Sequence, residues 1–569
     1  MANIFQNILV NRPKRSVFDL SYENKLSFDM GQLVPVYTEN VVPGDKFKVN
    51  TEVFLRFAPL VAPVMHRINC YVHYFFVPWR LVWEDWQDFI TGGEDGLQSP
   101  VFPRRNMVDS ATWTADGSLC DYLGYNFPTH NNSNSSVLEY SLLPLRAYQL
   151  IYNEYYRDQN LTSPIEFSLA SGDSNSLDNL VKGTSYSNDQ TGAEAAYTAL
   201  TTLRYRAWEK DYFTSALPFV QRGVAANIPV TLDTSNLTFA KKGSATSLDT
   251  VRRKIDRGYM ADGTTPPGDD IYIRTTGEIS TGGELMNFGN STDGSTGHYH
   301  PLPISEMTNK VKIVENSEGV TIIPPTINEL RLAEHIQRWL ERNARGGARY
   351  IEQILSHFGV RVPDFTLQRP QYLGGGKSPV QISEVLQTSS TDSTSPQGNM
   401  AGHAYSVGNK NYFKHTFDEH GFVLGIMSVL PRTSYQTGVS RHLLKFDKFD
   451  YYFPEFAHLG EQAVLNAELF NASAVSEYDN PAGTFGYQER YAEYKYRSGE
   501  VHGDFKSTLD SWHMGRKFVL QPSLNTSFVT SNPTNRIFAV TTGVQHMWCQ
   551  AYNNVRAVRP MPKHAVPSL

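Results

Sequence analysis

The clearest hydrophobic pattern in the chain runs from Phe47 to Gly93. One side of its first part carries Phe47, Val49, Thr51, Val53, Leu55 and Phe57, and the other carries Lys48, Asn50, Glu52, Phe54 and Arg56. A period of two over this length predicts a half-buried β-strand. A second strand, 68–77, is apolar on both faces, so we expect it to be covered on both sides. From Pro78 the pattern becomes helical, with Val82, Trp86, Phe89 and Ile90 on one stripe before Gly92-Gly93.

Three further stretches show helical spacing. The first places Leu145, Tyr148, Ile151, Tyr152 and Tyr155 on one stripe, which we interpret as core, and Tyr205, Trp208 and Phe213 are expected to anchor the apolar segment that follows. Thr326 and Glu329 form a capping-box pattern before a helix with the expected buried stripe Leu330, Ala333, Ile336 and Leu340. A shorter helix places Ile351, Ile354, Leu355 and Phe358 inward.

The last third returns to strand-like patterns. We predict strands in FVLGIMSVL, HLLKFDKFDYYFPEF, ERYAEYKYRSGEV and NRIFAVTTGVQHMWCQAY, the last as a hairpin about Thr542-Gly543. Strand-rich segments therefore lie at both ends of the chain and must pair across several hundred residues. Early and late strands share sheets in this way in jelly-roll β-sandwiches.

Two regions lack a sustained pattern. Residues 1–45 predict an extended N-terminal arm that gains order on a neighbouring surface, with a frayed terminus as the alternative. Residues 221–325 are rich in Gly, Ser and Thr and predict a surface insertion with a hairpin at 311–323, with simple disorder as the alternative. The remaining chain divides into early strands and loops (46–220), helices, loops and later strands (326–515), and a C-terminal segment (516–569).

Composition agrees with a mainly β protein and favours a reducing compartment. The chain has 569 residues with 31 Tyr, 31 Phe, 41 Gly and 31 Pro, which favours strands and turns. The three cysteines (Cys70, Cys120 and Cys549) are an odd number and far apart, so a disulfide framework is not expected. We find no signal-peptide pattern and no apolar run near the ~20 residues that span a bilayer.

Charge is unevenly distributed along the chain. The formal net charge is −6, yet residues 511–569 contain no Asp or Glu and six cationic residues. The first 510 residues therefore carry −6 minus 6, or −12. This asymmetry indicates either a basic segment that faces a polyanion or a tail that neutralises an acidic neighbour in the same fold.

Candidate catalytic and metal motifs are weak. Gly376-Lys377-Ser378 resembles the end of a phosphate-binding loop, but Gln371 stands where the first glycine belongs and Pro379 blocks the helix. The groups His298-Tyr299-His300 and His415, Asp418, Glu419 and His420 fit exposed loop and turn residues better than metal ligands. We expect no enzyme activity, no cofactor and no metal.

Several long blocks resemble the major capsid protein of the Microviridae, small single-stranded DNA phages, and especially its gokushovirus branch. They are HYFFVPWRLVWEDWQDFITGG, LQRPQYLGGGKSPVQISEVLQTSSTDSTSPQGNMAG, SYQTGVSRHLLKFDKFDYYFPEFAHLGEQAVLNAELF and FGYQERYAEYKYRSGEVHGDFKSTLDSWHM. The resemblance implies an eight-stranded antiparallel jelly-roll subunit with long loops, a few helices and a large surface insertion near a three-fold axis. Under this resemblance, Trp79, Trp83 and Trp86 are core or inter-subunit anchors, with core favoured for Trp86.

The resemblance also implies function and partners. The subunit would form pentamers and an icosahedral T=1 shell around circular single-stranded DNA, and would be assembled in the bacterial cytoplasm without membrane insertion. Scaffolding, pilot and small DNA-binding phage proteins would assist. The insertion, with His298, Tyr299 and His300, would contact a host receptor. Candidate DNA contacts are Arg12, Lys14, Arg15, Arg516, Lys517, Arg556, Arg559 and Lys563, with Trp548 and Tyr552 as stacking aromatics.

Two other functions remain open on the sequence alone. A carbohydrate-binding or glycan-processing β-sandwich of a phage fibre would explain the aromatic content, but no convergent carboxylate pair is evident. A free single-strand DNA-binding protein is disfavoured by the negative overall charge.

Overall fold

The computed structural model describes most of the chain outside the predicted insertion. Described residues are 13–106, 115–125, 138–173, 197–224, 326–347, 349–389, 391, 396–471 and 480–564, and the backbone of four short strands between 231 and 323. The chain divides into two compact units, one of residues 225–337 and one of the remaining residues. The smaller unit overlaps the predicted insertion at 221–325 and extends to Gln337.

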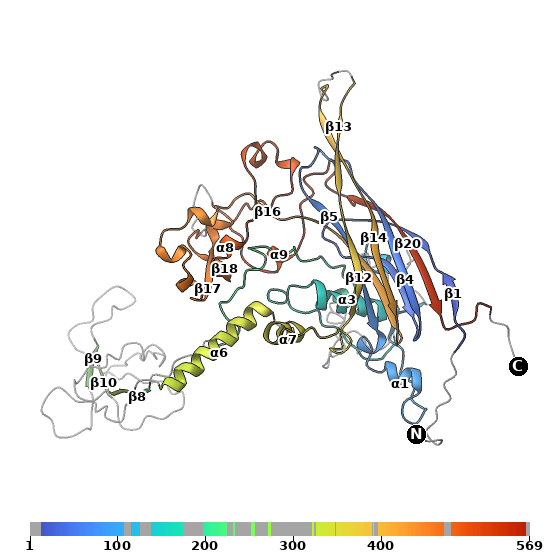
Figure 1. The fold of residues 1–569 in the computed structure, drawn as a ribbon, viewed down its shortest axis with the longest axis horizontal. Coiled ribbons are helices and arrows are strands. Elements are labelled where there is room, and N and C mark those ends of the chain that lie inside the picture. The colour runs from blue at the N-terminus through green and yellow to red at the C-terminus, as the bar shows by residue number, and fades with distance from the viewer. Residues whose placement is uncertain are drawn as a thin grey trace, which may run out of the picture. The chain divides into compact units, whose positions relative to one another are not determined.

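One antiparallel sheet of ten strands organises the larger unit (Figure 1). Eight strands follow each other in the order β1 (Ser16–Asp19), β20 (Met547–Arg559), β4 (Lys46–Phe57), β14 (Met400–Thr416), β12 (Gln371–Pro379), β5 (Ile68–Pro78), β15 (Gly421–Pro431) and β3 (Val34–Val41). Strand β2 (Tyr22–Phe28) also pairs with β20, and β13 (Gln381–Leu386) pairs with β14. The expected pairing of early with late strands is confirmed, because β4 lies between β20 and β14.

The sheet curls around a core made by its inward side chains. Strand β4 alternates as predicted, with Phe47, Val49, Val53, Leu55 and Phe57 all buried. Within the core, Asn553 of β20 donates from Nδ2 to the carbonyl of Val36 on β3, at 3.0 Å. These strands stand near opposite ends of the sheet order, so this bond shows that the sheet ends approach each other across the core. The predicted mainly β, antiparallel fold with few helices is confirmed.

A second apolar layer covers the other face of β5 and β15. Both strands are buried on both sides, as predicted for residues 68–77. The predicted stripe at 145–155 forms α3 (Leu143–Ile151) and a π-helical turn (Tyr152–Tyr156), and its side chains pack against Phe75, Leu424 and Ile426. Of the expected anchors, Trp208 and Phe213 are buried and Tyr205 is half-buried.

The predicted helix at 78–93 is two short helices rather than one. A 3-10 turn spans Trp79–Leu81, and α1 spans Trp86–Thr91 and ends at Gly92 in the left-handed region. Trp83 lies between them, fully buried, and its indole Nε1 donates to Ser171 Oγ at 2.8 Å. Trp79 is also buried and Trp86 is half-buried, so all three tryptophans belong to the core of this chain.

The expected N-terminal arm is extended, but its described part lies within the subunit. Residues 16–41 contain strands β1, β2 and β3, which pair with β20 and β15 of the same chain. The apolar residues of this segment lacked a long period because the three strands are short and separated by turns. Residues 1–12 lie outside the described residues.

The two predicted helices after residue 326 are present, but their apolar stripes are not buried. In α6 (Ile327–Gly346) the capping box is formed, since Thr326 N donates to Glu329 Oε2 at 2.7 Å and Glu329 N donates to Thr326 Oγ1 at 3.2 Å. Leu330 and Ile336 nevertheless remain exposed. In α7 (Tyr350–Phe358), Leu355 and Phe358 are exposed as well. Amphipathic helices with uncovered apolar stripes are typical of surfaces that another chain covers.

Two strand predictions in the last third are wrong. Residues 441–459, which we name the aromatic loop, form 3-10 turns at Arg441–Leu443, Lys448–Asp450 and Pro454–Phe456. Residues 489–501 contain the last residue of β18 (Thr484–Glu489), helix α8 (Ala492–Lys495) and the short strand β19 (Gly499–Glu500), which pairs with β16 (Ser434–Tyr435). The backbone nitrogens of Phe446 and Asp447 both donate to Asp450 Oδ2, at 3.0 Å, so local side-chain capping replaces strand pairing.

The predicted C-terminal hairpin is also incorrect. Strand β20 forms as expected, but residues 535–546 have no strand; this segment packs Ile537 and Phe538 into the core and forms an isolated bridge between Phe538 and Leu60. The remaining elements of the larger unit are β6 (Arg104–Asn106) with β7 (Glu139–Ser141), α2 (Leu119–Tyr122), β17 (Glu461–Leu465) with β18 (Thr484–Glu489), short 3-10 turns at Asn466–Glu468, Gly503–Lys506 and Asp510–Trp512, and α9 (Thr526–Val529).

The smaller unit contains two described strand pairs. Strand β8 (Thr231–Asp233) pairs with β11 (Thr321–Ile323), and β9 (Arg252–Ile255) pairs with β10 (Ile271–Arg274), both antiparallel. The predicted hairpin partner of residues 320–323, at 311–314, lies outside the described residues. No helix in the described part of the chain has the length and apolar character needed to cross a membrane.

Candidate nucleic-acid interface

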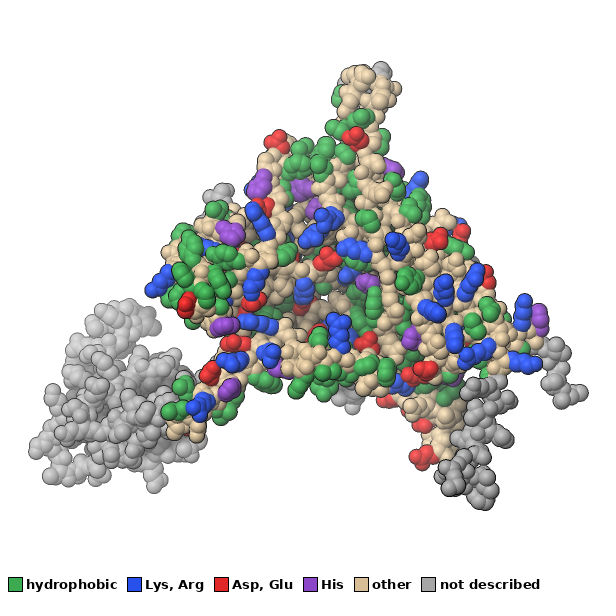
Figure 2. Space-filling view, in the orientation of Figure 1, with side chains coloured by type: hydrophobic (Ala, Val, Ile, Leu, Met, Phe, Trp, Pro, Cys, Tyr) green, Lys and Arg blue, Asp and Glu red, His purple; other side chains and the backbone are tan. Residues whose placement is uncertain are grey.

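The candidate interface is the solvent face of the sheet, which is formed by the outward residues of β4, β14 and β20. Because side chains of a strand alternate between faces, Lys46, Lys48 and Arg56 point away from the core that Phe47 and Leu55 enter. The pairing register then aligns these outward residues into rows that run across neighbouring strands. Figure 2 shows Lys and Arg side chains gathered over this part of the sheet.

One such row is cationic over three strands. Lys414 of β14 stands opposite Lys48 of β4, and Lys48 stands opposite Arg556 of β20. All three side chains are exposed, and among the described residues none of them forms an ion pair. Directly opposed side chains lie about 4.5–5.5 Å apart at Cβ, and like charges at that separation repel. We define these three residues as the cationic row.

A carboxylate closes the row at the sheet edge. Asp19 of β1 stands opposite Arg556. Its pKa is lowered, mainly by hydrogen bonds from the Ser21 hydroxyl and backbone, with Arg556 contributing by attraction. One carboxylate cannot neutralise three cations, so the row keeps a net positive charge that favours a bound anion.

Exposed aromatic side chains share this face with the cations. Tyr412 is 63% exposed and stands opposite Asn50, in the row next to the cationic row. Further along the strands lie Phe54, Trp548 and Tyr552, all on the solvent face. Glu23 and Glu52 flank Tyr552, so the face is mixed rather than uniformly basic. Cations that alternate with aromatic rings are the composition of single-strand nucleic-acid sites.

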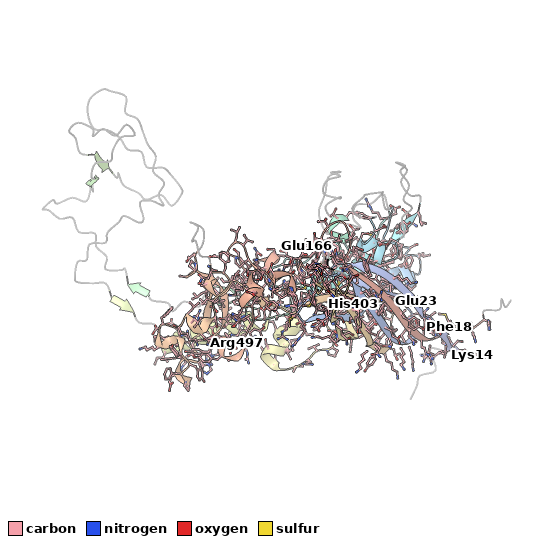
Figure 3. The ribbon with its side chains drawn as sticks, turned by 90° about the horizontal axis from the view of Figure 1, so that it is seen from above. Lys14, Phe18, Glu23, Glu166, His403 and Arg497 are labelled. Carbon is pink, nitrogen blue, oxygen red and sulfur yellow. The ribbon has the colours of Figure 1, made fainter. Side chains whose placement is uncertain are left out.

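The structure places some of the predicted DNA-contact residues on or near this face. Arg556 is a member of the cationic row, and Trp548 and Tyr552 lie on the same strand. Lys14 and Arg15 are exposed just before β1, and Figure 3 shows Lys14 at the same end of the sheet as Phe18 and Glu23. Lys563 is exposed beyond β20, whereas Lys517 lies 3.6 Å from Asp510 in another region. Arg12 lies outside the described residues.

Arg516, a predicted DNA contact, is half-buried against aromatic side chains of the same subunit. Its guanidinium carbon lies 4.1 Å from the ring centroid of Phe528 and 5.3 Å from that of Trp208, and Nη2 donates to the Phe528 carbonyl at 2.8 Å. Burial lowers its pKa. The side chain therefore joins aromatic segments inside the subunit through cation–π contacts.

Arg559 is likewise a structural residue. Its Nε lies 3.3 Å from a carboxylate oxygen of the fully buried Asp45, and its Nη2 lies 3.4 Å from Glu39. Nη2 also donates to the carbonyl of Asn40. Both carboxyl pKa values are raised, because burial outweighs the attraction of the guanidinium. Arg559 thus fits the second interpretation of the charge asymmetry, in which a basic residue of the tail neutralises acidic neighbours in the same fold.

Sequence reasoning missed Lys48 and Lys414. The signal for Lys48 was present, because it is an outward residue in the clearest strand of the chain. Lys414 can be recognised as a neighbour of Lys48 only from the pairing register of β14 with β4. This register joins residues several hundred positions apart. The density of basic residues along the sequence indicates the C-terminal cations, but it does not indicate a row whose members come from three separate segments.

The remaining motifs carry no site within the described residues. Gly376-Lys377-Ser378 lies in strand β12, so it cannot form a loop before a helix. His415 lies within β14, next to its last residue, and in the described part of the chain no group of three His, Cys, Asp or Glu residues could hold a metal ion. His298, Tyr299 and His300, the predicted receptor contacts, lie outside the described residues.

Comparison with known proteins gives consistent matches over the whole chain. The family model described as capsid protein (F protein) matches residues 6–569. The chain is 36% identical to capsid protein VP1 of Chlamydia phage 1, over 100% of this chain and 98% of that protein. It is 34% identical to capsid protein VP1 of Bdellovibrio phage phiMH2K, over 97% and 95% of the two chains. Capsid protein VP1 of Spiroplasma virus 4 is 29% identical, over 98% and 96%.

Proposed function

Because this chain belongs to the phage capsid protein (F protein) family, we propose that it self-assembles into an icosahedral T=1 shell around a circular single-stranded DNA genome. The family is one of structural proteins rather than enzymes, and its members form the virion. This sets aside the glycan-processing alternative. Members of the family assemble as oligomers into a shell. We propose the T=1 geometry of this shell, the DNA that it encloses and its contact with the host.

The exposed apolar surface supports contact with other copies of the chain. The aromatic loop exposes seven large apolar side chains: Leu443, Phe446, Phe449, Tyr451, Tyr452, Phe453 and Leu459. Helices α6 and α7 expose further apolar residues. Monomeric soluble proteins rarely leave apolar patches of this extent uncovered, and larger ones mark association surfaces. In the proposed shell, neighbouring subunits bury the aromatic loop and the stripe of α7.

The cationic row is the single observation that best supports a DNA contact. Lys414, Lys48 and Arg556 come from three strands, so their alignment reflects the fold rather than a local run of basic sequence. Without a counter-charge, their mutual repulsion destabilises the sheet, and backbone phosphates remove that repulsion. We therefore place the solvent face of the sheet toward the enclosed DNA.

Neutralising the row should weaken DNA binding without unfolding the subunit. In the triple variant Lys48→Gln, Lys414→Gln and Arg556→Gln, we expect the affinity of the full chain for single-stranded DNA to fall by about tenfold or more. The slope of log affinity against log salt should decrease by about 2, since each lost phosphate contact removes about 0.7. Fluorescence anisotropy with labelled oligo-dT at several salt concentrations measures both values.

A charge-matched control separates this site from general electrostatics. Lys495→Gln, Arg497→Gln and Lys506→Gln make the same change in net charge at exposed positions away from the sheet. We expect this control to retain its salt slope and the DNA content of purified particles. Equal behaviour of the two triple variants would show that the row is not a DNA site.

We also propose that the insertion contacts the host receptor. Its separation into a compact unit of its own supports a role apart from the sheet. The register of the strands at its base suggests a clean deletion, because Asp233 stands opposite Thr321 in the β8–β11 pair. Replacing residues 234–320 by Asn-Gly joins these strands with a two-residue turn.

The deletion variant should form shells that no longer adsorb to host cells. The expected result is normal particle yield by electron microscopy and a loss of adsorption of at least tenfold in a cell-binding assay. A control with the same residues replaced by a Gly/Ser linker of similar length tests whether the inserted length itself matters. Normal adsorption of either particle would contradict a receptor role for the insertion.

A further inference from the structure

A second feature of the solvent face lies where β2, β4 and β20 run side by side. A shallow groove of about 440 Å³ opens there, lined by Lys25, Leu26, Ser27, Phe54, Arg56, Trp548, Cys549 and Gln550. Its volume falls within the ~300–1,000 Å³ typical of small-molecule sites. Along β4, Arg56 is eight residues from Lys48, which places the groove about 27 Å from the cationic row.

Two aromatic residues occupy diagonal positions on adjacent strands at this groove. Trp548 stands opposite Arg56, and Phe54 stands opposite Gln550, so Trp548 and Phe54 are diagonal neighbours on adjacent strands. Diagonal neighbours lie about 7–8 Å apart. A planar ring stacked at about 3.5 Å on each side needs a separation of about 7 Å, which matches the spacing of these two strand positions.

Both rings are partly exposed to solvent. Trp548 is 49% exposed and Phe54 is 39% exposed. Among the described residues, Trp548 has no ring contact and its indole nitrogen has no hydrogen bond. Phe54 is contacted by the Arg56 guanidinium carbon, 5.4 Å from its ring centroid. A half-exposed tryptophan without a partner, on a strand of an otherwise well-packed sheet, is available for a ligand.

The charges around the rings define the ligand class. Lys25 and Arg56 line the groove, and no carboxylate is among its lining residues. Glu23 lies beside the groove, 3.7 Å from the Lys25 ammonium in an exposed pair, and accepts a hydrogen bond from Gln550 Nε2 at 3.2 Å. A ligand that suits two rings and two cations is planar and aromatic and carries negative charge beside the ring. A nucleotide within a single strand has this chemistry.

We propose that this groove is a base-stacking subsite, in which one nucleobase of single-stranded DNA inserts between Trp548 and Phe54. The adjacent phosphates lie against Lys25 and Arg56. This inference rests on the proposed function, because it uses the same face toward DNA, and it adds a contact to bases rather than to phosphates alone. The cationic row fixes the strand by charge, and the groove holds it by stacking.

The test compares normal and abasic oligonucleotides bound to the full-length protein. In Trp548→Ala we expect affinity for oligo-dT to fall about tenfold, the range for one lost stacking contact. Affinity for an abasic oligonucleotide of equal length should be unchanged by the same substitution. Trp548→Phe keeps an aromatic face and should restore most of the oligo-dT affinity. Phe365→Ala, which removes an exposed aromatic side chain outside both the proposed DNA face and the aromatic loop, serves as the matched control and should have no effect.

A second measurement uses assembled particles and needs no variant. DNA that contains 5-iodo-deoxyuridine is packaged, irradiated and digested, and the cross-linked peptides are identified by mass spectrometry. We expect a cross-link at Trp548 or Phe54. If oligo-dT and abasic DNA bind equally, Trp548→Ala has no effect and no such cross-link forms, the groove is not a base site. The proposed DNA face would still stand if neutralising the cationic row weakens both oligonucleotides, whereas no binding by the wild-type chain would overturn both proposals.

Discussion

The double variant Phe446→Asp and Phe453→Asp should yield a folded subunit that no longer assembles into shells. Phe446 is 87% exposed and Phe453 is also exposed, so neither contributes to the core of the isolated chain. Burying an aromatic side chain in an interface contributes about 1.5–3 kcal/mol, and burying an unpaired carboxylate costs several kcal/mol more. We therefore expect association at this contact to weaken by at least about 100-fold.

Negative-stain microscopy and mass photometry of the purified variant measure this loss directly. A control pair, Leu97→Asp and Val224→Asp, makes the same chemical change at exposed apolar positions outside the aromatic loop. We expect the control to assemble. Particles of normal size and yield from the Phe446 and Phe453 variant would show that the aromatic loop is not a subunit contact, while circular dichroism confirms that each variant remains folded.

The sequence predicted the strands whose two faces differ in character. Strand β4 alternates because one of its faces is core and the other is solvent, and this contrast is visible in the sequence itself. Strand β5 was predicted as doubly covered because both of its faces are apolar. In both cases the strand's own residues indicate which of its faces are buried, so the prediction does not require knowledge of the neighbouring strands.

The aromatic loop shows where the same reasoning fails. Polar residues separate Phe446, Phe449 and Tyr451, and an aromatic run at 451–453 follows, which resembles a strand. The loop instead turns because Asp450 accepts two backbone hydrogen bonds and Pro454 begins another 3-10 turn. In a shell-forming protein an exposed interface can be as apolar as a core, so apolar periodicity alone does not identify buried strands.

The candidate DNA site was only partly predictable for a different reason. Arg516 and Arg559 are cations in a segment without acidic residues, which suggested an exposed basic surface. Their partners, Phe528 with Trp208 and Asp45 with Glu39, are supplied partly or wholly by distant segments and convert both arginines into structural residues. The cationic row depends on strand register in the same way. Local charge therefore identified only one of the three residues of the cationic row, Arg556.

Gly31→Ala should be the most destabilising single substitution that we propose. Gly31 has φ +83°, and a Cβ atom placed there would lie 2.0 Å from the carbonyl oxygen of Ser531, a backbone atom. The same residue donates its N–H to Val429 at 2.9 Å and accepts from Arg206 N at 2.8 Å, so three segments meet at its backbone. Relief of the clash requires breaking this junction, and we expect a loss of about 4 kcal/mol or more in the free energy of unfolding.

Gly96→Ala is the matched control, because it shares the backbone conformation without the crowding. Gly96 has φ +71° and no atom within 4 Å of its Cβ position, so it should lose only the left-handed penalty of about 1–2 kcal/mol. Urea unfolding of the soluble subunits gives both values, or the soluble yield does where Gly31→Ala fails to fold. The difference between the variants isolates the close approach to Ser531. Equal losses would mean that the junction can open without disturbing the sheet, and that β3 is held to β15 by strand pairing alone.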